Sequence, residues 1–497
     1  MPIARFHLCL VAAAALAAGG CAPSVRLDQP RTSLPAAFDA EQTALSASQE
    51  AEAIDRWWYR FGDPQLVELV DRALADSTDA RTAYFRLREA RAIRDQSLSQ
   101  RLPTGNLTGN ARIQGGEQFS GVDFMGSTAT AKSLSGAFSP AWEIDLFGRL
   151  AAIGRGARAN YVAAAYDYHA TRLSLAADVA SALFEARGLL VQRNDAAETL
   201  RITEELAATS RLGLARGLVS GADTARLESD VATARAEVVR LDAALHNARR
   251  SLLVLTGRAD APVSSLPIEP RLDIPPAVPA AFPATLLTRR PDVLSAQARL
   301  AAAAAQVKVD RLALFPQFTL QGSGSITRTT GMLGGTNGLW SLASGVTLPI
   351  LDRPRLMARL RATEAQGQQA VIAYEAAVQA AFRDADTALF TVASDRPRLA
   401  ELTRAEERSR FAFEAARQGY RIGLTDLTTL LQSERSWRAA RTALTIARSQ
   451  ALTNVVSAFR ALGGGWDPAA PAIAPGHEPV PLPVAADPPA NIQTPVS

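Results

Sequence analysis

Cysteine and lysine are both scarce in this sequence. The two cysteines, Cys9 and Cys21, lie near the N-terminus, and none follows them. The two lysines are Lys132 and Lys308, so nearly all of the 53 basic side chains are arginines. The formal net charge of +4 is small for 497 residues, and no basic run is interleaved with aromatic residues. This composition argues against a nucleic-acid-binding protein.

Sequence motifs of metal sites and enzyme active sites are missing as well. His7, His169, His246 and His477 lie far apart and lack the spacing of metal ligands. Neither a P-loop nor a nucleophile elbow occurs. We therefore predict that the protein is not an enzyme and that it has neither a metal site nor a cofactor.

Long apolar runs are absent beyond Cys21. No run reaches the roughly 18 residues that a membrane-spanning helix needs. A role in a membrane would therefore depend on a lipid, on partner proteins or on a β-barrel.

The N-terminus has the pattern of a secretory signal peptide. Arg5 precedes an apolar stretch over residues 8–18, and two glycines precede Cys21. Cleavage before Cys21 would leave that cysteine as the first residue and the sole cysteine of the mature chain. An internal disulfide is then excluded, and a cysteine in this position predicts a lipidated N-terminus.

Residues 16–21, LAAGGC, resemble a bacterial lipobox, although Ala18 stands where Leu is expected. Ala22 follows the cysteine instead of Asp, which in lipoproteins favours sorting to the outer membrane. We therefore predict that Cys21 carries a lipid. A secreted protein with an incidental cysteine is the alternative.

The sequence also repeats itself. A shift of 206 residues brings identical residues into register over about residues 148–257. Further upstream the shift becomes 213, which a loop-length difference of 7 explains. This pattern predicts a structural duplication. The aligned pairs include Gly217 with Gly423, Leu218 with Leu424, Gly257 with Gly463 and Pro103 with Pro316.

Each half predicts the same order of elements. A helix that ends at a proline precedes two strands of alternating apolar and polar residues, a very long helix and a return helix that ends at glycine. The long helix of residues 150–212 would extend about 95 Å if continuous. Its counterpart, residues 356–418, contains Pro397 as a candidate kink. The first helices begin near Pro64 and Pro291 and end at Pro103 and Pro316; the strands start at residues 107, 134, 318 and 340, the last reaching residue 350; the return helices cover residues 222–256 and 428–462.

The strands determine the predicted fold class. Each has the length and the period of 2 that suit a bilayer-spanning strand, but four are too few to close a barrel. An open sheet in lipid would leave backbone groups without hydrogen bonds. We therefore predict a mixed α and β membrane protein, a trimer whose 12-stranded β-barrel, with four strands per chain, continues into a long α-helical barrel. A soluble four-stranded sheet covered by helices is the alternative.

Four motifs occur in a fixed order along the chain. They are WW at residues 57–58 with FGDPQL at 61–66, WEIDLFGR at 142–149, LLTRRPDV at 286–293 and GGGW at 463–466. Together they resemble the TolC-like outer-membrane factors, specifically the efflux lipoproteins of the NodT type, over nearly all of the mature chain.

The resemblance implies an outer-membrane channel of a tripartite efflux system that exports small molecules. The α-helical barrel would extend through the periplasm, and the expected partners are outer-membrane lipids, a periplasmic adaptor (membrane fusion) protein and an inner-membrane pump of the resistance-nodulation-division type. The implied division is a signal peptide at 1–20, a lipidated leader and equatorial segment at 21–62, a first repeat at 63–257, a linker at 258–282, a second repeat at 283–466 and a disordered Pro-rich tail at 467–497.

By the same resemblance, the turns at residues 211–220 and 417–426 would meet the adaptor, and the positions beyond the second turn would narrow the periplasmic gate. Family members often carry carboxylates at two of these positions, where this chain has Thr429 and Gln432. The predicted docking residues are Gly217, Leu218, Val219, Ser220, Gly423, Leu424, Thr425 and Asp426. The predicted gate residues are Tyr420, Arg421, Asp426, Thr429 and Gln432.

Two other functions stay open from the sequence. One is the outer-membrane duct of a type I protein secretion system, which the NodT-like motifs and the lipidation disfavour. The other is a periplasmic structural lipoprotein built on helical hairpins, which the duplicated amphipathic strands disfavour.

Overall fold

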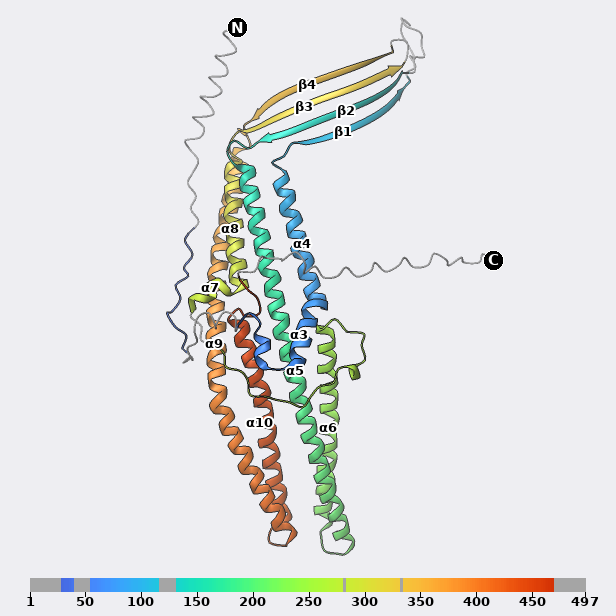
Figure 1. Ribbon diagram of the computed structural model, residues 1–497, viewed down its shortest axis with the longest axis vertical. Helices are drawn as coiled ribbons and strands as arrows, with labels where there is room; N and C mark the ends of the chain where they lie inside the picture. Colours follow the sequence, from blue (N-terminus) through green and yellow to red (C-terminus); the bar gives the residue numbers. More distant parts are fainter. Residues whose placement is uncertain (1–27, 40–53, 116–130, 280–282, 331–333, 469–497) are drawn as a thin grey trace, which may run out of the picture. The chain divides into compact units, whose positions relative to one another are not determined.

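The computed structural model describes residues 28–39, 54–115, 131–279, 283–330 and 334–468 (Figure 1). The predicted signal peptide, Cys21 and the tail from residue 469 lie outside them. The described residues form two compact units, one of residues 28–31, 87–115, 131–164, 295–330 and 334–376, the other of residues 32–39, 54–86, 165–279, 283–294 and 377–468. The elements are η2 (Trp57–Phe61), α3 (Pro64–Asp76), α4 (Thr78–Ser99), β1 (Thr104–Gln114), β2 (Ala131–Ile144), α5 (Arg149–Ala215), α6 (Gly221–Leu255), η3 (Val263–Ser265), η4 (Pro283–Thr285), α7 (Leu286–Arg289), α8 (Pro291–Leu312), β3 (Gln317–Thr330), β4 (Gly335–Thr347), α9 (Arg353–Arg421) and α10 (Leu427–Ala461).

The helices confirm the duplication and both of its offsets. α4 and α8 have 22 residues each, and they begin at Thr78 and Pro291, 213 residues apart. α6 and α10 have 35 residues each, and they begin at Gly221 and Leu427, 206 residues apart. The change of offset therefore falls in the stretch between these helices, as the sequence predicts.

In the first unit, the four strands form one antiparallel sheet in the order β1-β2-β3-β4 (Figure 1). Leu107 faces Phe138, which faces Gly324, which faces Trp340. Opposed residues lie on the same side of a sheet, so this register creates an apolar face and a polar face, as predicted. The apolar face carries Leu107, Ile113, Leu134, Phe138, Trp142, Ile144, Phe318, Leu320, Ile326, Trp340, Leu342 and Val346; the polar face carries Thr108, Asn110, Arg112, Ser135, Glu143, Gln321, Ser323, Thr327, Asn337 and Ser341, together with Leu339.

The sheet is incomplete in the single chain. β1 and β4 are the edges of the described sheet, and each pairs with a neighbour on one side only. Leu107 and Trp340 on the apolar face are largely exposed. We predicted that the last strand reaches residue 350, but β4 ends at Thr347. Pro349 explains the early end, because proline has no N–H to donate to a strand partner.

One prediction about the helices was too simple. The segment from residue 64 to residue 99 forms two helices, because Ser77 is extended (φ −63°, ψ 148°) and its Oγ accepts a hydrogen bond from the Ala80 N–H at 3.0 Å. Ser77 thereby caps α4. α9 runs through Pro397 as one helix, so the proline does not end it, and a kink at Pro397 stays a prediction.

Small residues allow the helices of the first unit to approach closely. A Cβ added to Gly154 of α5 would lie 3.0 Å from the Leu98 side chain of α4. A buried hydrogen bond connects α8 and α9, from Thr363 Oγ1 to Asp310 Oδ2 at 2.6 Å. Glycine and alanine at such positions bring whole helices together and leave little room for larger side chains.

The core of the second unit joins segments that are far apart in the sequence. Trp57 is fully buried, and its ring stacks on Phe459 of α10 at 5.6 Å between centroids. Phe184 of α5 belongs to the same cluster. Leu266 and Ile268, from the segment that we expected to be a linker, are also buried in it. That segment therefore contributes to the core as well as connecting the two halves.

Candidate functional site

Two turns with the same backbone geometry reverse the long helices in the second unit (Figure 1). In the first, the Leu218 N–H donates to the carbonyl oxygen of Gly213 at 2.9 Å; in the second, the Leu424 N–H donates to that of Gly419 at 2.8 Å. Gly217 and Gly423 have φ of +71° and +75°. This is the glycine-dependent helix ending. We call residues 213–220 and 419–426 the tip turns.

The predicted docking residues have two different structural roles. Leu218 and Leu424 are 77% and 80% exposed and present apolar surface to solvent. Ser220 and Asp426 cap the return helices, since Ser220 Oγ accepts from the Asp223 N–H at 3.1 Å and Asp426 Oδ1 from the Thr429 N–H at 2.7 Å. The hydrogen bonds from the Thr429 backbone N–H and side chain lower the pKa of Asp426.

The predicted gate residues do not form one cluster within the chain. Tyr420 is half-buried against the apolar cluster of Ile202, Phe413, Ala416 and Leu430. Arg421, Thr429 and Gln432 are exposed, and Asp426 has its capping role. Their place at the gate therefore remains a prediction about an assembly of chains.

A polar cluster behind the tip turns escaped the sequence analysis. Trp437 of α10 stacks on Phe413 of α9 at 5.1 Å, and its Nε1 donates to Glu406 Oε1 at 3.0 Å. Arg441 lies over the Trp437 ring at 5.4 Å and pairs with Asp195 of α5. Burial raises the pKa of Asp195. The cluster thus ties three helices together. Its one sequence clue is a tryptophan within helices rich in Ala and Arg.

A second polar contact links the two return helices. Arg435 of α10 pairs with Asp230 of α6 at 2.8 Å. Beside it, Glu434 is only 6% exposed, and burial raises its pKa. Glu434 lies four residues after Leu430 and three after Leu431, which are also buried, so the helical spacing places this carboxyl on the buried face of α10.

A buried ion pair fixes the FGDPQL motif. Asp63 Oδ1 caps α3 by accepting from the N–H groups of Gln65 at 3.0 Å and Leu66 at 3.2 Å. Arg187 of α5 pairs with both carboxylate oxygens and donates to Gln65 Oε1 at 2.9 Å. Asp63 and Arg187 are 4% and 1% exposed. Burial acts to raise the pKa of Asp63, but Arg187 and the two N–H groups outweigh it, so the pKa is lowered.

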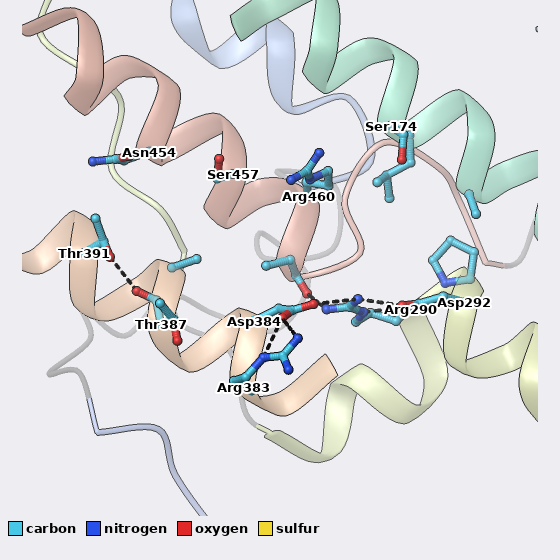
Figure 2. Close-up of a pocket in the computed structure, with 15 residues that line it drawn as sticks. Ser174, Arg290, Asp292, Arg383, Asp384, Thr387, Thr391, Asn454, Ser457 and Arg460 are labelled. Carbon is cyan, nitrogen blue, oxygen red and sulfur yellow. Dashed lines mark hydrogen bonds and ion pairs between the residues drawn. The ribbon is translucent and has the colours of Figure 1, made fainter. Parts of the chain in front are cut away.

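Arg290 and Asp292 of the LLTRRPDV motif line a pocket of about 690 Å³ (Figure 2). Arg290 donates to the carbonyl oxygens of Ala381 on α9 at 3.3 Å and Ala461 on α10 at 3.2 Å, and it pairs with Asp292 at 2.6 Å. Asp384 lies 3.6 Å away. A cation at the carbonyl end of α10 is favourable. Arg383 pairs with Asp384 at 2.8 Å, so two cations face two carboxylates. We therefore interpret the pocket as a place where helices are held together by ion pairs.

The GGGW motif packs next to the preceding one. Trp466 Nε1 donates to the carbonyl oxygen of Arg289 at 3.0 Å, and its ring stacks on His169 at 4.8 Å. Burial, with the nearby charge of Arg172, lowers the pKa of His169 to about 4. The shift favours the uncharged imidazole, because burial and Arg172 both disfavour a positive charge at this position.

Comparison with known proteins decides the family. The family described as outer membrane efflux protein matches residues 69–258 and 282–464, which is most of the chain. The chain belongs to this family. The pyoverdine export outer membrane protein OpmQ of Pseudomonas aeruginosa is 30% identical over 423 residues, covering 84% of this chain and 89% of OpmQ. The probable outer membrane lipoprotein SilC of Salmonella typhimurium is 26% identical over 440 residues, covering 88% and 94%.

A solved structure agrees with the sequence comparison. The outer-membrane channel OprN superposes with a TM-score of 0.75 at 29% identity, covering 90% of this chain and 99% of OprN. The chain therefore has the TolC-like channel fold that we predicted, mostly helical with four antiparallel strands. It is an outer-membrane component of an efflux system. Among the described helices, none is both long and apolar enough to cross a membrane.

Proposed function

We propose that three copies of this efflux protein close a 12-stranded β-barrel in the outer membrane. The observation that supports this best is the sheet itself, with one apolar face and two edges, β1 and β4, that pair on one side only. In a bilayer each unpaired backbone group costs several kcal/mol, so the edges need partners. Pairing β1 of one copy with β4 of the next satisfies both edges, and the apolar faces then meet lipid.

In this assembly the polar face lines a duct, and the helical hairpins continue it into the periplasm. Passage through the duct requires no bond to be made or broken, so the protein acts without catalysis and without a cofactor. We infer that small molecules are exported. The matched family is named for efflux and OpmQ for pyoverdine export, which supports efflux over a type I protein secretion duct or a periplasmic structural lipoprotein.

Disulfide cross-links across the free edges test the trimer. Cysteines placed at Thr108 on β1 and in turn at Ser341, Ala343 or Gly345 on β4 all lie on the polar face. We expect one pairing to yield a covalent species with three times the mass of the single chain on a denaturing gel.

The matched control places cysteines at Ser135 and Thr327, which are direct partners on β2 and β3 of one chain. It should cross-link at the mass of a single chain. If every β1–β4 pairing remains monomeric while this control oxidises, the shared barrel is wrong.

Lipidation of Cys21 is part of the same proposal, because residue 21 follows a signal peptide pattern and SilC is named an outer membrane lipoprotein. The denaturing mass of the purified chain should equal residues 21–497 plus attached acyl groups. An unmodified mass would remove the lipid anchor from the proposal and leave the barrel unaffected.

We further propose that the tip turns dock a periplasmic adaptor, which connects the duct to an inner-membrane pump of the resistance-nodulation-division type. Leu218 and Leu424 are duplicated, exposed and apolar, as the centre of a docking surface needs to be. Tyr420, Arg421, Asp426, Thr429 and Gln432 would then form the gate at the closed end. Gly217, Val219, Ser220, Gly423 and Thr425 would shape the docking turns.

Replacing both tip leucines tests the docking role. We expect Leu218→Asp with Leu424→Asp to weaken adaptor binding at least tenfold, because each change adds a charge to an apolar contact. The measurement is adaptor binding to the trimer in detergent. Val239→Asp, at an exposed apolar position within α6, is the control and should bind as the wild type does. Equal binding by all three proteins would place docking elsewhere.

A further inference from the structure

Two cations interrupt the apolar face of the sheet. Lys132 of β2 faces Ile113 and Thr330, and Arg328 of β3 faces Leu134 and Thr336, so both lie on the apolar face. Both side chains are exposed. Lys132 and Arg328 are diagonal neighbours across β2 and β3, a placement that puts them about 7–8 Å apart.

Both cations lie at the end of the sheet that is far from the helices. The opposite end begins with Ile144, which faces Phe318. There Phe147 contacts Phe315 and Phe318 at 5.2 and 6.3 Å between ring centroids. Aromatic residues of this kind mark the boundary of the apolar band on a membrane barrel. Ile144 therefore marks the boundary of the apolar band on the side of the helices.

The height of the cations matches the thickness of the apolar band. Arg328 faces Leu134, 10 residues before Ile144 on β2. At about 3.4 Å per residue and a tilt of about 40°, that is about 26 Å above the boundary, and Lys132 lies about 31 Å above it. The apolar band of an outer-membrane barrel is about 25 Å tall. Both cations therefore lie where hydrocarbon gives way to headgroups.

Charge on the described strands is complementary to a negatively charged ligand. Glu143 is the one carboxylate in the four strands, and it lies on the polar face near the helices. Lys132 and Arg328 thus have no acidic strand neighbour on the apolar face. A guanidinium can contact a phosphate through two N–H groups at once, and an ammonium adds a second point charge.

We propose that Lys132 and Arg328 form a binding site for the phosphate group of an anionic lipid in the outer leaflet, one site per copy around the barrel. The proposal rests on the barrel proposed above, because only in a closed barrel does the apolar face meet lipid. Thr330 and Thr336, opposite the two cations, add hydroxyl donors at the same level.

Binding of a defined lipid to the detergent-purified trimer tests the site. The probes are lipid A with two phosphates and the same lipid after dephosphorylation. Near a membrane surface each basic residue contributes about fivefold in affinity, so Lys132→Gln with Arg328→Gln should weaken binding of the phosphorylated lipid about 25-fold. The dephosphorylated lipid should bind the wild type weakly, and millimolar inorganic phosphate should not displace the phosphorylated one.

Arg112→Gln is the matched control. Arg112 faces Ser133, so it lies between the levels of Lys132 and Leu134 but on the polar face. Arg112→Gln removes one positive charge, as each single cation variant does, and should keep full lipid affinity. If the double variant fails to assemble, Lys132→Gln and Arg328→Gln are measured singly, each with a fivefold loss expected.

Three results would overturn the site: unchanged affinity in the cation variants, an equal loss in Arg112→Gln, or equal binding of both lipids by the wild type. The β1–β4 cross-link, repeated in each variant, separates the two proposals. A cross-linked trimer with unchanged lipid affinity refutes the site and keeps the barrel.

Discussion

Replacing Arg187 by methionine should be among the most damaging single changes in the second unit, with a loss of about 3–5 kcal/mol in the free energy of unfolding. Methionine retains much of the volume but leaves the Asp63 carboxylate buried without its partner. The Asp63 carboxylate also caps α3, so losing Arg187 removes the group that holds this cap in place at the start of the helix. We expect a lower midpoint in urea and a lower Tm for the purified trimer.

Arg193→Met is the control, because Arg193 is on the same helix and pairs with Asp242 at 2.9 Å near the surface. It should cost less than about 1 kcal/mol. Asp63→Asn combined with Arg187→Met should recover much of the loss, because Asn still caps a helix and no charge remains buried. Equal midpoints for the two single variants would show that the buried pair contributes no more than a surface one.

The sign of the pH dependence follows from the same pair. Because the pKa of Asp63 is lowered in the folded chain, the contribution of the pair is complete above the unfolded value near 3.9. It decreases as the pH falls from there through the folded pKa. Arg187→Met should therefore lose most of its difference from the wild type in strong acid.

Local and periodic features of the fold were predictable from the sequence. A period of 2 along each strand gave the two faces of the sheet, because neighbouring side chains alternate. The return helices were placed within one residue, because Gly257 and Gly463 end them. The break at Ser77 was missed, since an apolar helical pattern runs through it and one serine decides the cap.

Contacts between distant segments were not predictable. Asp63 and Arg187 are 124 residues apart, and nothing in either local pattern points to the other. The tip turns could be found because glycine and leucine recur at one offset. The cluster of Asp195, Trp437 and Arg441 could not, because its charges have the spacing of a solvated helix surface.

Gly257→Ala and Gly463→Ala should each destabilise the chain more than Gly217→Ala. All three glycines have φ between +71° and +74°, so alanine is strained at each by about 1–2 kcal/mol. At Gly217 a new Cβ would meet nothing within 4 Å. At Gly257 it would lie 2.7 Å from the carbonyl oxygen of Asp76, and at Gly463 2.8 Å from that of Arg289. These neighbours are backbone atoms and cannot rotate away.

We therefore expect an additional loss of about 1–3 kcal/mol at Gly257 and Gly463, measured as the difference in urea midpoint from Gly217→Ala. Equal midpoints for the three variants would mean that only the backbone conformation matters. The two contacts are duplicates of each other: Gly257 and Gly463 are 206 residues apart, whereas Asp76 and Arg289 are 213 apart. The insertion that separates the offsets lies between the contacting segments. Each half has thus retained the same close contact between its return helix and its opening helices, which is the reason to expect glycine to be required at both positions.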